Sequence, residues 1–458
     1  MTSTTFSSLP LSAEMLSNLE SLGYNEMTPI QSQSLPIILQ GQDIIAKAKT
    51  GSGKTAAFGI GILAMLDVKK FAIQSLVLCP TRELADQVAK EIRRIARATH
   101  NVKVLTLCGG VSIGPQLGSL EHGAHIIVGT PGRIVDHIEK GSLKLDNIKQ
   151  LVLDEADRML DMGFADSLKV VLNACPAERQ TLLFSATYPD EIKAISAHCQ
   201  KNPQEVHVES VHSDVNIEQH FYELREGEAK DAAVQKLLAH FKPQSSIVFC
   251  NTKVQCQEVC DLLRAQRINA LALHGDLEQR ERDQVLVRFA NKSCSVLIAT
   301  DVAARGIDVK GLDAVINVEL AHDSEVHIHR IGRTGRAGEN GLALSLVSPK
   351  ELGRLNRLED YLQKPITLEQ VPENDGAIGI MPEMVTLNID GGKKDKVRPG
   401  DIIGALTKDA GLPFEKIGKI DIFEFASYVA VHQSIAKQAL QHLQDGKIKG
   451  RKFRARKL

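Results

Sequence analysis

The sequence lacks several features that would assign it to a common class at once. None of its eight cysteines forms a Cys-x-x-Cys pair, so a zinc site is not predicted. No apolar run approaches the roughly 18 residues that a membrane span needs. The N-terminus has no basic region followed by an apolar stretch, as a signal peptide would. These absences favour a soluble cytoplasmic protein with reduced thiols and no membrane attachment.

An excess of charge is also missing when the chain is taken as a whole. Its 55 Lys and Arg stand against 56 Asp and Glu, a balance that argues against nucleic-acid binding. The balance is uneven, however. Residues 384–458 hold 15 basic and 8 acidic residues, whereas residues 1–383 hold 40 and 48. Because clustered basic residues attract nucleic acid, the last segment is predicted to bind it. The alternative is a basic domain that is merely soluble.

What is present points to an α/β protein of about three domains, given 458 residues. Short apolar runs alternate with amphipathic stretches over residues 1–207 and again over 208–365. That pattern is typical of parallel sheets covered by helices. The expected strands are rich in Val, Ile and Leu, and they are 43–48, 75–80, 102–107, 125–130, 150–154 and 181–185, then 246–250, 270–274, 296–300, 314–319 and 343–347.

The remaining residues are predicted to form a linker and a small α+β domain. Residues 366–383 are rich in Pro, Gly and Glu and aperiodic, which is typical of a linker. Residues 384–458 show a β-α-β-β-α-β order, the RRM-like plan. Its aromatic pattern is poor, with Tyr428 on an expected strand and Phe425 nearby. We therefore expect RNA contacts through loops and the tail rather than by stacking on the sheet.

A phosphate-binding loop is predicted between the first expected strand and the helix after it. Gly51 and Gly53 let backbone N–H groups face phosphate oxygens. Lys54 is expected to reach the β- and γ-phosphates, and the Thr55 hydroxyl to bind Mg²⁺. The whole nucleotide loop consists of Ala48, Lys49, Thr50, Gly51, Ser52, Gly53, Lys54 and Thr55.

A second phosphate-site motif lies about a hundred residues further on. The apolar run 151–153 ends in Asp154 and Glu155. Asp154 is expected to hold Mg²⁺, and Glu155 to orient or deprotonate the attacking water. Alone, these carboxylates would fit a solvated strand end better, but the upstream loop favours the catalytic interpretation.

Residues 154–157 read Asp-Glu-Ala-Asp, and the chain resembles the DEAD-box RNA helicases over residues 6–350. The resemblance implies two tandem RecA-like domains and an RNA-dependent ATPase. It assigns adenine recognition to Phe6 and Gln31, in a motif that includes Thr28, and a ribose contact to Asp308. Arg333 and Arg336 match the family's arginine fingers. The residues that couple ATP to RNA are, by resemblance, Asp157, Ser185, Thr187 and His329.

The resemblance also implies contacts to the RNA backbone in both RecA-like domains. Such contacts to phosphates and 2′-hydroxyls carry little sequence information. Taken singly, the Thr and Gly residues among the matching positions fit a helix cap or a turn better than an RNA contact. The residues are Thr81, Arg82, Gly109, Gly110, Thr130, Gly132, Arg133, Gly275, Gln279, Arg282 and Thr300.

The third unit is similar to that of the DbpA subgroup in its segments 390–394, 398–401 and 446–450. The resemblance implies that this domain directs a monomeric helicase to 23S rRNA during large-subunit assembly. Its expected RNA contacts are Lys393, Lys394, Lys396 and Arg398. Two other functions stay open: an ATP-gated RNA clamp or annealing chaperone, and a DNA helicase, which the motif set disfavours.

Overall fold

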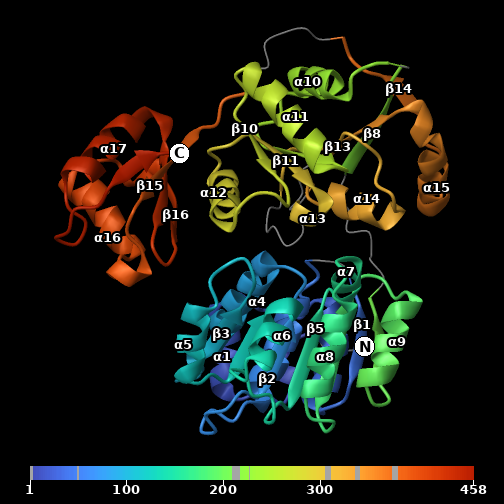
Figure 1. Cartoon of the computed structure of the whole chain (residues 1–458), viewed down its shortest axis with the longest axis vertical. Coiled ribbons are helices and arrows are strands. Elements are labelled where there is room, and N and C mark those ends of the chain that lie inside the picture. The colour runs from blue at the N-terminus through green and yellow to red at the C-terminus, as the bar shows by residue number, and fades with distance from the viewer. Residues whose placement is uncertain are drawn as a thin grey trace. The chain divides into compact units, whose positions relative to one another are not determined.

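The computed structural model describes residues 4–48, 51–208, 217–225, 227–304, 311–335, 341–373 and 380–458. The chain divides into two compact units, Met1–Ser213 and Asp214–Leu458. Each unit is built on a seven-stranded sheet, and the second unit carries a further four-stranded sheet (Figure 1). This architecture confirms the predicted fold class of two parallel-sheet domains followed by a small α+β domain.

The sheet of the first unit is parallel throughout, with the strand order β3-β4-β2-β5-β6-β1-β7. The strands are β1 Ile44–Lys47, β2 Ser75–Leu78, β3 Val104–Leu107, β4 Ile126–Gly129, β5 Gln150–Asp154, β6 Gln180–Ser185 and β7 Gln204–His207. The helices are α1 Ala13–Ser21, α2 Pro29–Leu39, α3 Lys54–Met65, α4 Arg82–Ile95, α5 Gly114–Glu121, α6 Pro131–Glu139, α7 Ala156–Asp161, α8 Ala165–Ala174 and α9 Asp190–Cys199.

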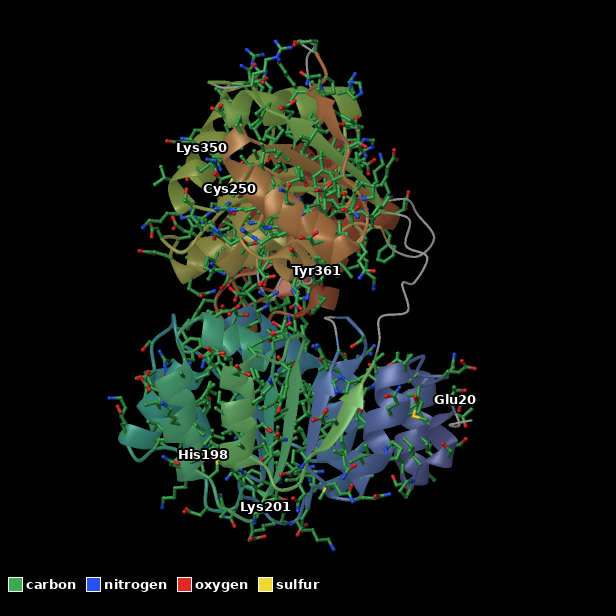
Figure 2. All side chains as sticks on the ribbon, turned by 90° about the vertical axis from the view of Figure 1, so that its right-hand side faces the viewer. Glu20, His198, Lys201, Cys250, Lys350 and Tyr361 are labelled. Atoms are coloured by element: carbon green, nitrogen blue, oxygen red, sulfur yellow. The ribbon has the colours of Figure 1, made fainter. Side chains whose placement is uncertain are left out.

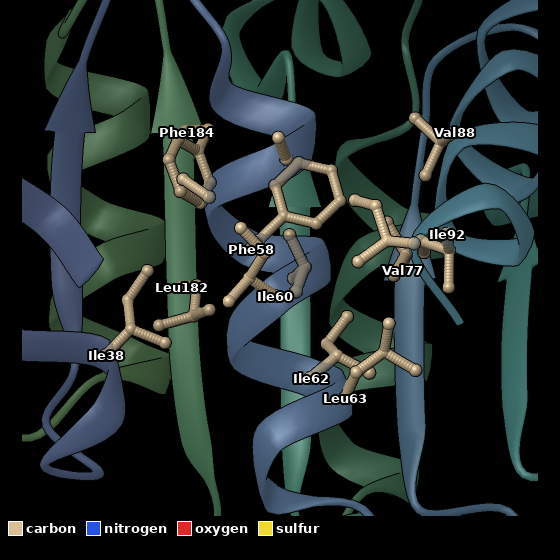
Figure 3. Packing of buried hydrophobic residues seen from close by; sticks show 14 of the residues in the cluster. Ile38, Phe58, Ile60, Ile62, Leu63, Val77, Val88, Ile92, Leu182 and Phe184 are labelled. Carbon is tan, nitrogen blue, oxygen red and sulfur yellow. The ribbon is translucent and has the colours of Figure 1, made fainter. Parts of the chain in front are cut away.

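Helix α3 is the central element of this unit's core. It is apolar on nearly all sides and buried from its first residue, Lys54, to Leu63 with the single exception of Thr55. Figure 3 shows Phe58 of α3 beside Phe184 of β6, and their ring centroids lie 5.4 Å apart. Because a helix that is apolar all round is stable only when covered, this packing fixes the position of the loop that precedes α3.

The sheet of the second unit is also parallel, with the order β10-β11-β9-β12-β13-β8-β14. Its strands are β8 Ile217–Glu223, β9 Ser246–Cys250, β10 Ala270–Leu273, β11 Val296–Thr300, β12 Ala314–Asn317, β13 Gly341–Val347 and β14 Leu368–Gln370. The helices are α10 Lys230–Phe241, α11 Lys253–Ala265, α12 Gln279–Ala290, α13 Asp301–Ala304, α14 Ser324–Ile331 and α15 Leu352–Leu362.

Three strands were not expected from the sequence, namely β7, β8 and β14. Strands β7 and β14 are the edges of their sheets, and β8 pairs with β14. Their sequences mix polar and charged residues, so they show no continuous apolar run. Strand β14 also occupies part of the segment 366–383 that was expected to be a linker, and it extends the second sheet.

The C-terminal sheet is antiparallel, with the order β16-β17-β15-β18. Its core side chains, such as Leu387, Val429 and Leu443, lie between the sheet and its helices. The elements follow the expected β-α-β-β-α-β order, and they are β15 Met384–Ile389, α16 Pro399–Gly404, β16 Ile417–Ile422, β17 Ser427–His432, α17 Ala436–Asp445 and β18 Ala455–Lys457.

Charged side chains cover the surface of each unit, whereas the thiols are inside. Figure 2 shows Glu20, Lys201 and Lys350 at the surface, and Cys250 lies within the second unit. All eight cysteines are free, and seven of them are buried. In the part of the chain that the structure describes, no helix is long and apolar enough to cross a bilayer.

Candidate functional site

The predicted residues of the first unit gather at one edge of its sheet. In a parallel sheet, all strands end at the same edge, and ligands bind there. Strands β1, β5 and β6 are neighbours and end in the predicted nucleotide residues. Strands β2, β3 and β4 are also neighbours and end in the predicted RNA residues. The strand order therefore separates the predicted residues of this edge into two groups, which we call the nucleotide half and the RNA half after their predicted ligands.

The nucleotide half begins with the loop between β1 and α3. Gly51 and Gly53 both have positive φ angles, 84° and 97°, which L side chains rarely adopt. Lys54 is only 6% exposed, and its Nζ donates to the Ala48 carbonyl oxygen at 2.9 Å. The loop is thereby closed by its own lysine. Lys49 and Thr50, also predicted here, lie outside the described residues.

The Gln31 side chain links α2 to this loop. Its Nε2 donates to the Gly53 carbonyl oxygen at 3.1 Å, and its Oε1 accepts the Thr28 N–H at 2.9 Å. A Cβ atom on Gly53 would approach Gln31 Nε2 to 2.6 Å, so glycine is required for this contact. Phe6 is 4% exposed and meets Tyr24 edge-on at 6.2 Å between ring centroids. Phe6 and Gln31 are thus both fixed by neighbours, and Gln31 directly adjoins the phosphate-binding loop.

Asp154, at the end of β5, is the most perturbed carboxylate of this half. It is 2% exposed, and its Oδ1 has no hydrogen-bond partner among the described atoms. Burial raises the pKa of its carboxyl to about 7; the Lys54 ammonium opposes this rise, and the Glu155 carboxylate adds to it. A buried, unpartnered carboxylate oxygen beside phosphate-loop residues fits a Mg²⁺ ligand, because Mg²⁺ typically takes one or two carboxylates plus substrate phosphates.

Glu155 directly follows Asp154 and has a left-handed backbone, with φ and ψ both 53°. This conformation is uncommon for a residue with a side chain and costs about 1–3 kcal/mol, which the surrounding fold must offset. It ends strand β5 abruptly and starts helix α7. The turn consequently places Asp154 at the end of the strand and Glu155 at the start of the helix.

Three predicted coupling residues meet between α7 and β6. The Asp157 Oδ2 atom accepts the Thr187 N–H at 3.0 Å and the Thr187 hydroxyl at 3.1 Å. The Ser185 hydroxyl accepts the Asp157 N–H at 3.3 Å. These hydrogen bonds connect the end of strand β6 to the first turn of α7, which Glu155 directly precedes, so a shift of one moves the other.

The RNA half presents backbone groups and hydroxyls at helix starts. Thr81 caps α4 by accepting the Leu84 N–H at 3.2 Å, and Gly109 N–H donates to the Thr130 hydroxyl at 3.4 Å. A Cβ on Gly109 or Gly132 would meet open space, so neither glycine is needed for packing. Gly110 has a φ of 77°.

The two arginines of the RNA half are held at their positions by the protein. Arg82 pairs with Asp86 at 3.8 Å, and Arg133 contacts Asp136 at 3.1 Å and the Val111 carbonyl oxygen at 2.9 Å. Each retains one buried Nη1 atom without a hydrogen-bond partner. Both guanidinium groups are therefore oriented in advance and keep donor capacity, which suits contacts to a phosphate backbone.

In the second unit, the predicted residues follow β10 and β11 or lie on α12 and α14. Gly275 follows β10 and faces open space, and Thr300 ends β11. On α12, Gln279 donates to Asp283 at 2.9 Å, and Arg282 donates to the Ala303 carbonyl oxygen at 3.3 Å. His329 lies on α14, and Arg333 follows its end. Asp308 and Arg336 lie outside the described residues.

Arg330 is a residue that the sequence analysis did not select. It is 2% exposed, and its guanidinium forms an ion pair with Asp301 at 2.7 Å. It also donates to Asn251 at 2.8 Å and lies over the Phe249 ring, 5.2 Å from its centroid. These partners follow or end strands β9 and β11, so Arg330 fastens α14 to the carboxyl edge of the second sheet. Asp301 and Arg330 belong to separate motifs in the sequence, and only the fold brings the two residues into contact.

The predicted basic residues of the C-terminal domain lie in one ordered loop between β15 and α16. Lys393, Lys394, Lys396 and Arg398 are all exposed. The Asp395 carboxylate accepts the Gly392 N–H at 3.1 Å, which closes the turn. Lys449 approaches from the loop before β18, and its Nζ donates to the Lys396 carbonyl oxygen at 3.1 Å. The loop thus concentrates positive charge on a fixed backbone.

Three family descriptions match the chain, each over a separate segment. Residues 28–195 match "DEAD/DEAH box helicase", and residues 229–338 match "Helicase conserved C-terminal domain". Residues 386–457 match "DbpA RNA binding domain". The three segments correspond to the two parallel-sheet modules and the four-stranded domain.

Individual relatives agree with these matches. The ATP-dependent RNA helicase DbpA of Escherichia coli (strain K12) is 55% identical over 456 residues, which cover 99% of this chain and 100% of that protein. The DEAD-box ATP-dependent RNA helicase CshA of Geobacillus kaustophilus is 44% identical and covers 82% of each chain. A structure of S. cerevisiae Dbp5 bound to RNA and ADP BeF3 is 31% identical, with a TM-score of 0.72 over 81% of this chain and 96% of that chain.

Proposed function

This chain belongs to the DEAD-box ATP-dependent RNA helicases, with a DbpA-type RNA-binding domain, and from that premise we propose how its residues divide the work. ATP is bound and hydrolysed at the nucleotide half of the first sheet edge, short RNA duplexes are destabilised at the RNA half, and the C-terminal domain selects the RNA. The observation that carries this proposal is the division of one sheet edge between the two groups of residues.

The nucleotide contacts follow from the geometry of the loop before α3. Gly51, Gly53 and Lys54 bind the phosphates through backbone N–H groups and the ammonium group. Thr55 and the unpartnered Oδ1 of Asp154 hold Mg²⁺, which offsets the phosphate charge when bound. Glu155 orients the attacking water and accepts its proton. Gln31 and Phe6 recognise adenine, with Thr28, Ala48, Lys49, Thr50 and Ser52 completing the nucleotide site.

Hydrolysis is proposed to require both units. Arg333 and Arg336 of the second unit stabilise the charge that develops on the γ-phosphate, and Asp308 contacts the ribose. Because these groups belong to the second unit, they complete the site only in the ATP-bound closed state. Asp157, Ser185, Thr187 and His329 link nucleotide state to RNA, and the hydrogen bonds of Asp157 with Thr187 support this role.

The RNA is proposed to be 23S rRNA within precursors of the large subunit, and the protein to act as a cytoplasmic monomer. Two observations support the choice of RNA. The C-terminal domain matches the DbpA RNA-binding family, and residues 384–458 contain 15 basic but only 8 acidic residues. We propose residues 1–207 and 208–365 as the RecA-like domains and 384–458 as the RNA-binding domain. The linker 366–383 is then shortened at its start by strand β14.

Strand displacement tests the proposal. A short fluorescent RNA duplex that is attached to 23S rRNA is mixed with the protein and either ATP or a non-hydrolysable analogue. The proposal expects release of the short strand with both nucleotides but repeated turnover only with ATP. Binding of the RNA with ATP or the analogue but without strand release, or accelerated annealing in place of release, would favour the RNA clamp or annealing chaperone instead. The same assay with a DNA duplex separates an RNA enzyme from a DNA helicase.

A further inference from the structure

An exposed aromatic ring stands beside the basic loop of the C-terminal domain. Phe425 is 71% exposed and lies at the tip of the hairpin between β16 and β17. The Phe423 N–H donates to the Ala426 carbonyl oxygen at 2.8 Å, so Glu424 and Phe425 form the tip itself. A phenylalanine exposed to this extent gains little of the roughly 2 kcal/mol that burial of its ring would give, and the ring is available to a ligand.

The hairpin tip and the basic loop are one rigid structure. The Lys393 N–H donates to the Phe423 carbonyl oxygen at 2.9 Å, and the Lys394 N–H donates to the Glu424 carbonyl oxygen at 3.0 Å. A Cβ on Gly392 would approach the Phe423 carbonyl oxygen to 2.4 Å, which shows how closely the two backbones meet. The backbone of Lys393 and Lys394 is thereby held against the hairpin tip that carries Phe425.

The open face of the sheet offers no comparable platform. Its side chains Thr386, Asn388 and Tyr428 are 1%, 0% and 3% exposed. Within the second unit, the Ser293 and Thr386 hydroxyls are hydrogen-bonded at 2.6 Å, and Asn291 donates to Thr386 at 3.4 Å. The sheet face of the RNA-binding domain is thus covered, and an RNA base has no access to Tyr428 there.

We propose that Phe425 is a base-stacking residue, on which one unpaired base of the bound RNA lies while Lys393 and Lys394 contact the flanking phosphates. Every base presents a π-face, so an aromatic ring between cations is typical of single-stranded nucleic-acid sites. The acidic residues of the hairpin tip and of the segment 391–398 are Glu424 and Asp395, and the Asp395 carboxylate is engaged with the Gly392 N–H. The proposal rests on RNA binding by the C-terminal domain.

The first test measures the affinity of the full-length protein for RNA without nucleotide. The probe is a fluorescein-labelled hairpin RNA with a single-stranded extension, and the readout is anisotropy. Phe425→Ala is expected to weaken binding about tenfold, because stacking of one base accounts for that factor or more. Phe425→Trp is expected to bind at least as tightly as the wild type. Binding of Phe425→Ala within about twofold of the wild type would overturn the proposal.

A matched control comes from the same domain. Phe414 is 64% exposed and lies in the short turn before β16, outside both the basic loop and the hairpin tip. Phe414→Ala is expected to leave the affinity unchanged. Equal weakening by Phe414→Ala would mean that any exposed ring contributes, which contradicts a specific platform. Since both rings are exposed, unchanged unfolding midpoints verify that each variant is folded.

Photocrosslinking locates the contact directly. After irradiation of the full-length protein with the same RNA, the nucleotide adduct is expected on the peptide that contains Phe425. An adduct elsewhere, together with unchanged affinity, would assign the exposed ring to a protein contact instead. If the wild type itself bound the probe no better than residues 1–383, RNA binding by the domain would fail, and the role of Phe425 with it.

Discussion

The carboxyl edge of the first sheet and the basic loop of the C-terminal domain handle negatively charged ligands in opposite ways. At the sheet edge, Lys54 and Asp154 are buried, 6% and 2% exposed, and the phosphate contacts proposed there depend on backbone geometry. In the basic loop, the lysines are exposed and the charge is concentrated. The first arrangement favours chemistry on one ligand in one orientation. The second favours attraction of many ligands.

This difference explains why the net charge of −1 misleads. A buried site needs few charges, because a low dielectric strengthens each one. An exposed site needs many, because salt screens each of them. The net charge of the whole chain reveals neither the few buried charges of the first site nor the many exposed charges of the second. Charge has to be counted by domain before nucleic-acid binding is excluded.

The largest effect is expected from a change at the sheet edge. Glu155→Gln removes the carboxylate that is proposed to accept a proton from water, and it keeps the size of the side chain. ATP turnover is expected to fall by about a hundredfold or more, while ATP and RNA stay bound together in a long-lived closed complex. Steady-state ATPase rates and RNA retention in ATP measure both effects.

The matched control is Glu205→Gln on the edge strand β7, where the side chain is exposed and pairs only with His207. It is expected to turn over like the wild type. Unchanged turnover in Glu155→Gln would remove Glu155 from the mechanism.

The second effect concerns the stability of the second unit. Arg330→Ala leaves the half-buried Asp301 without its ion-pair partner and removes a guanidinium that is itself buried, which is expected to cost about 2–4 kcal/mol, less than the loss of a fully buried pair. Urea denaturation is expected to show this loss, whereas Arg357→Ala, on the exposed face of α15, is expected to change stability by less than about 0.5 kcal/mol. A loss equal to that of Arg357→Ala would mean that Arg330 does not fasten α14.

The third effect depends on pH. Because burial raises the pKa of Asp154 from 3.8 to about 7, the nucleotide-free protein loses stability as the pH rises through that interval. Asp154→Asn is not subject to this loss. Its stability advantage is expected to be small near pH 4 and to reach roughly 4 kcal/mol near pH 8. Urea denaturation at several pH values without nucleotide measures it, and an advantage independent of pH would contradict the account.

The smallest effect is expected in the basic loop. Lys393→Ala and Lys394→Ala each remove one phosphate contact, so each is expected to reduce the slope of log affinity against log salt by about one. Substituting Lys437 on α17 provides a control outside the loop. Binding isotherms at several salt concentrations give the slopes. Slopes that do not change would mean that these lysines are solvated and do not contact phosphate.

Local motifs made most of the site predictable. The strand, loop and helix around Lys54 and the strand before Asp154 are continuous in sequence, so their geometry follows from neighbouring residues. The network of Arg330 is different, because its partners Asn251 and Asp301 come from other strands. Sequence spacing carries no information on such contacts, and the parallel sheet alone brings them together.

The strands also divide into those that the sequence predicts and those that it does not. Buried strands such as β5 and β9 were predicted from their apolar runs, since both of their faces are covered. The edge strands β7 and β14 are stabilised mainly by backbone pairing to one neighbour, so their side chains need no apolar pattern. Likewise, the burial of Gln31 against Gly53 depends on the packing of α2 on α3, which no local pattern encodes.

The central claim is that ATP-driven chemistry and RNA selection reside in separate parts of the chain. The most direct test compares the ATPase rates of the full-length protein and of residues 1–383 with a panel of RNAs that includes intact 23S rRNA. The account predicts that the shortened protein keeps an RNA-stimulated ATPase of similar maximal rate but responds equally to all RNAs. Full preference for 23S rRNA in the shortened protein would contradict it.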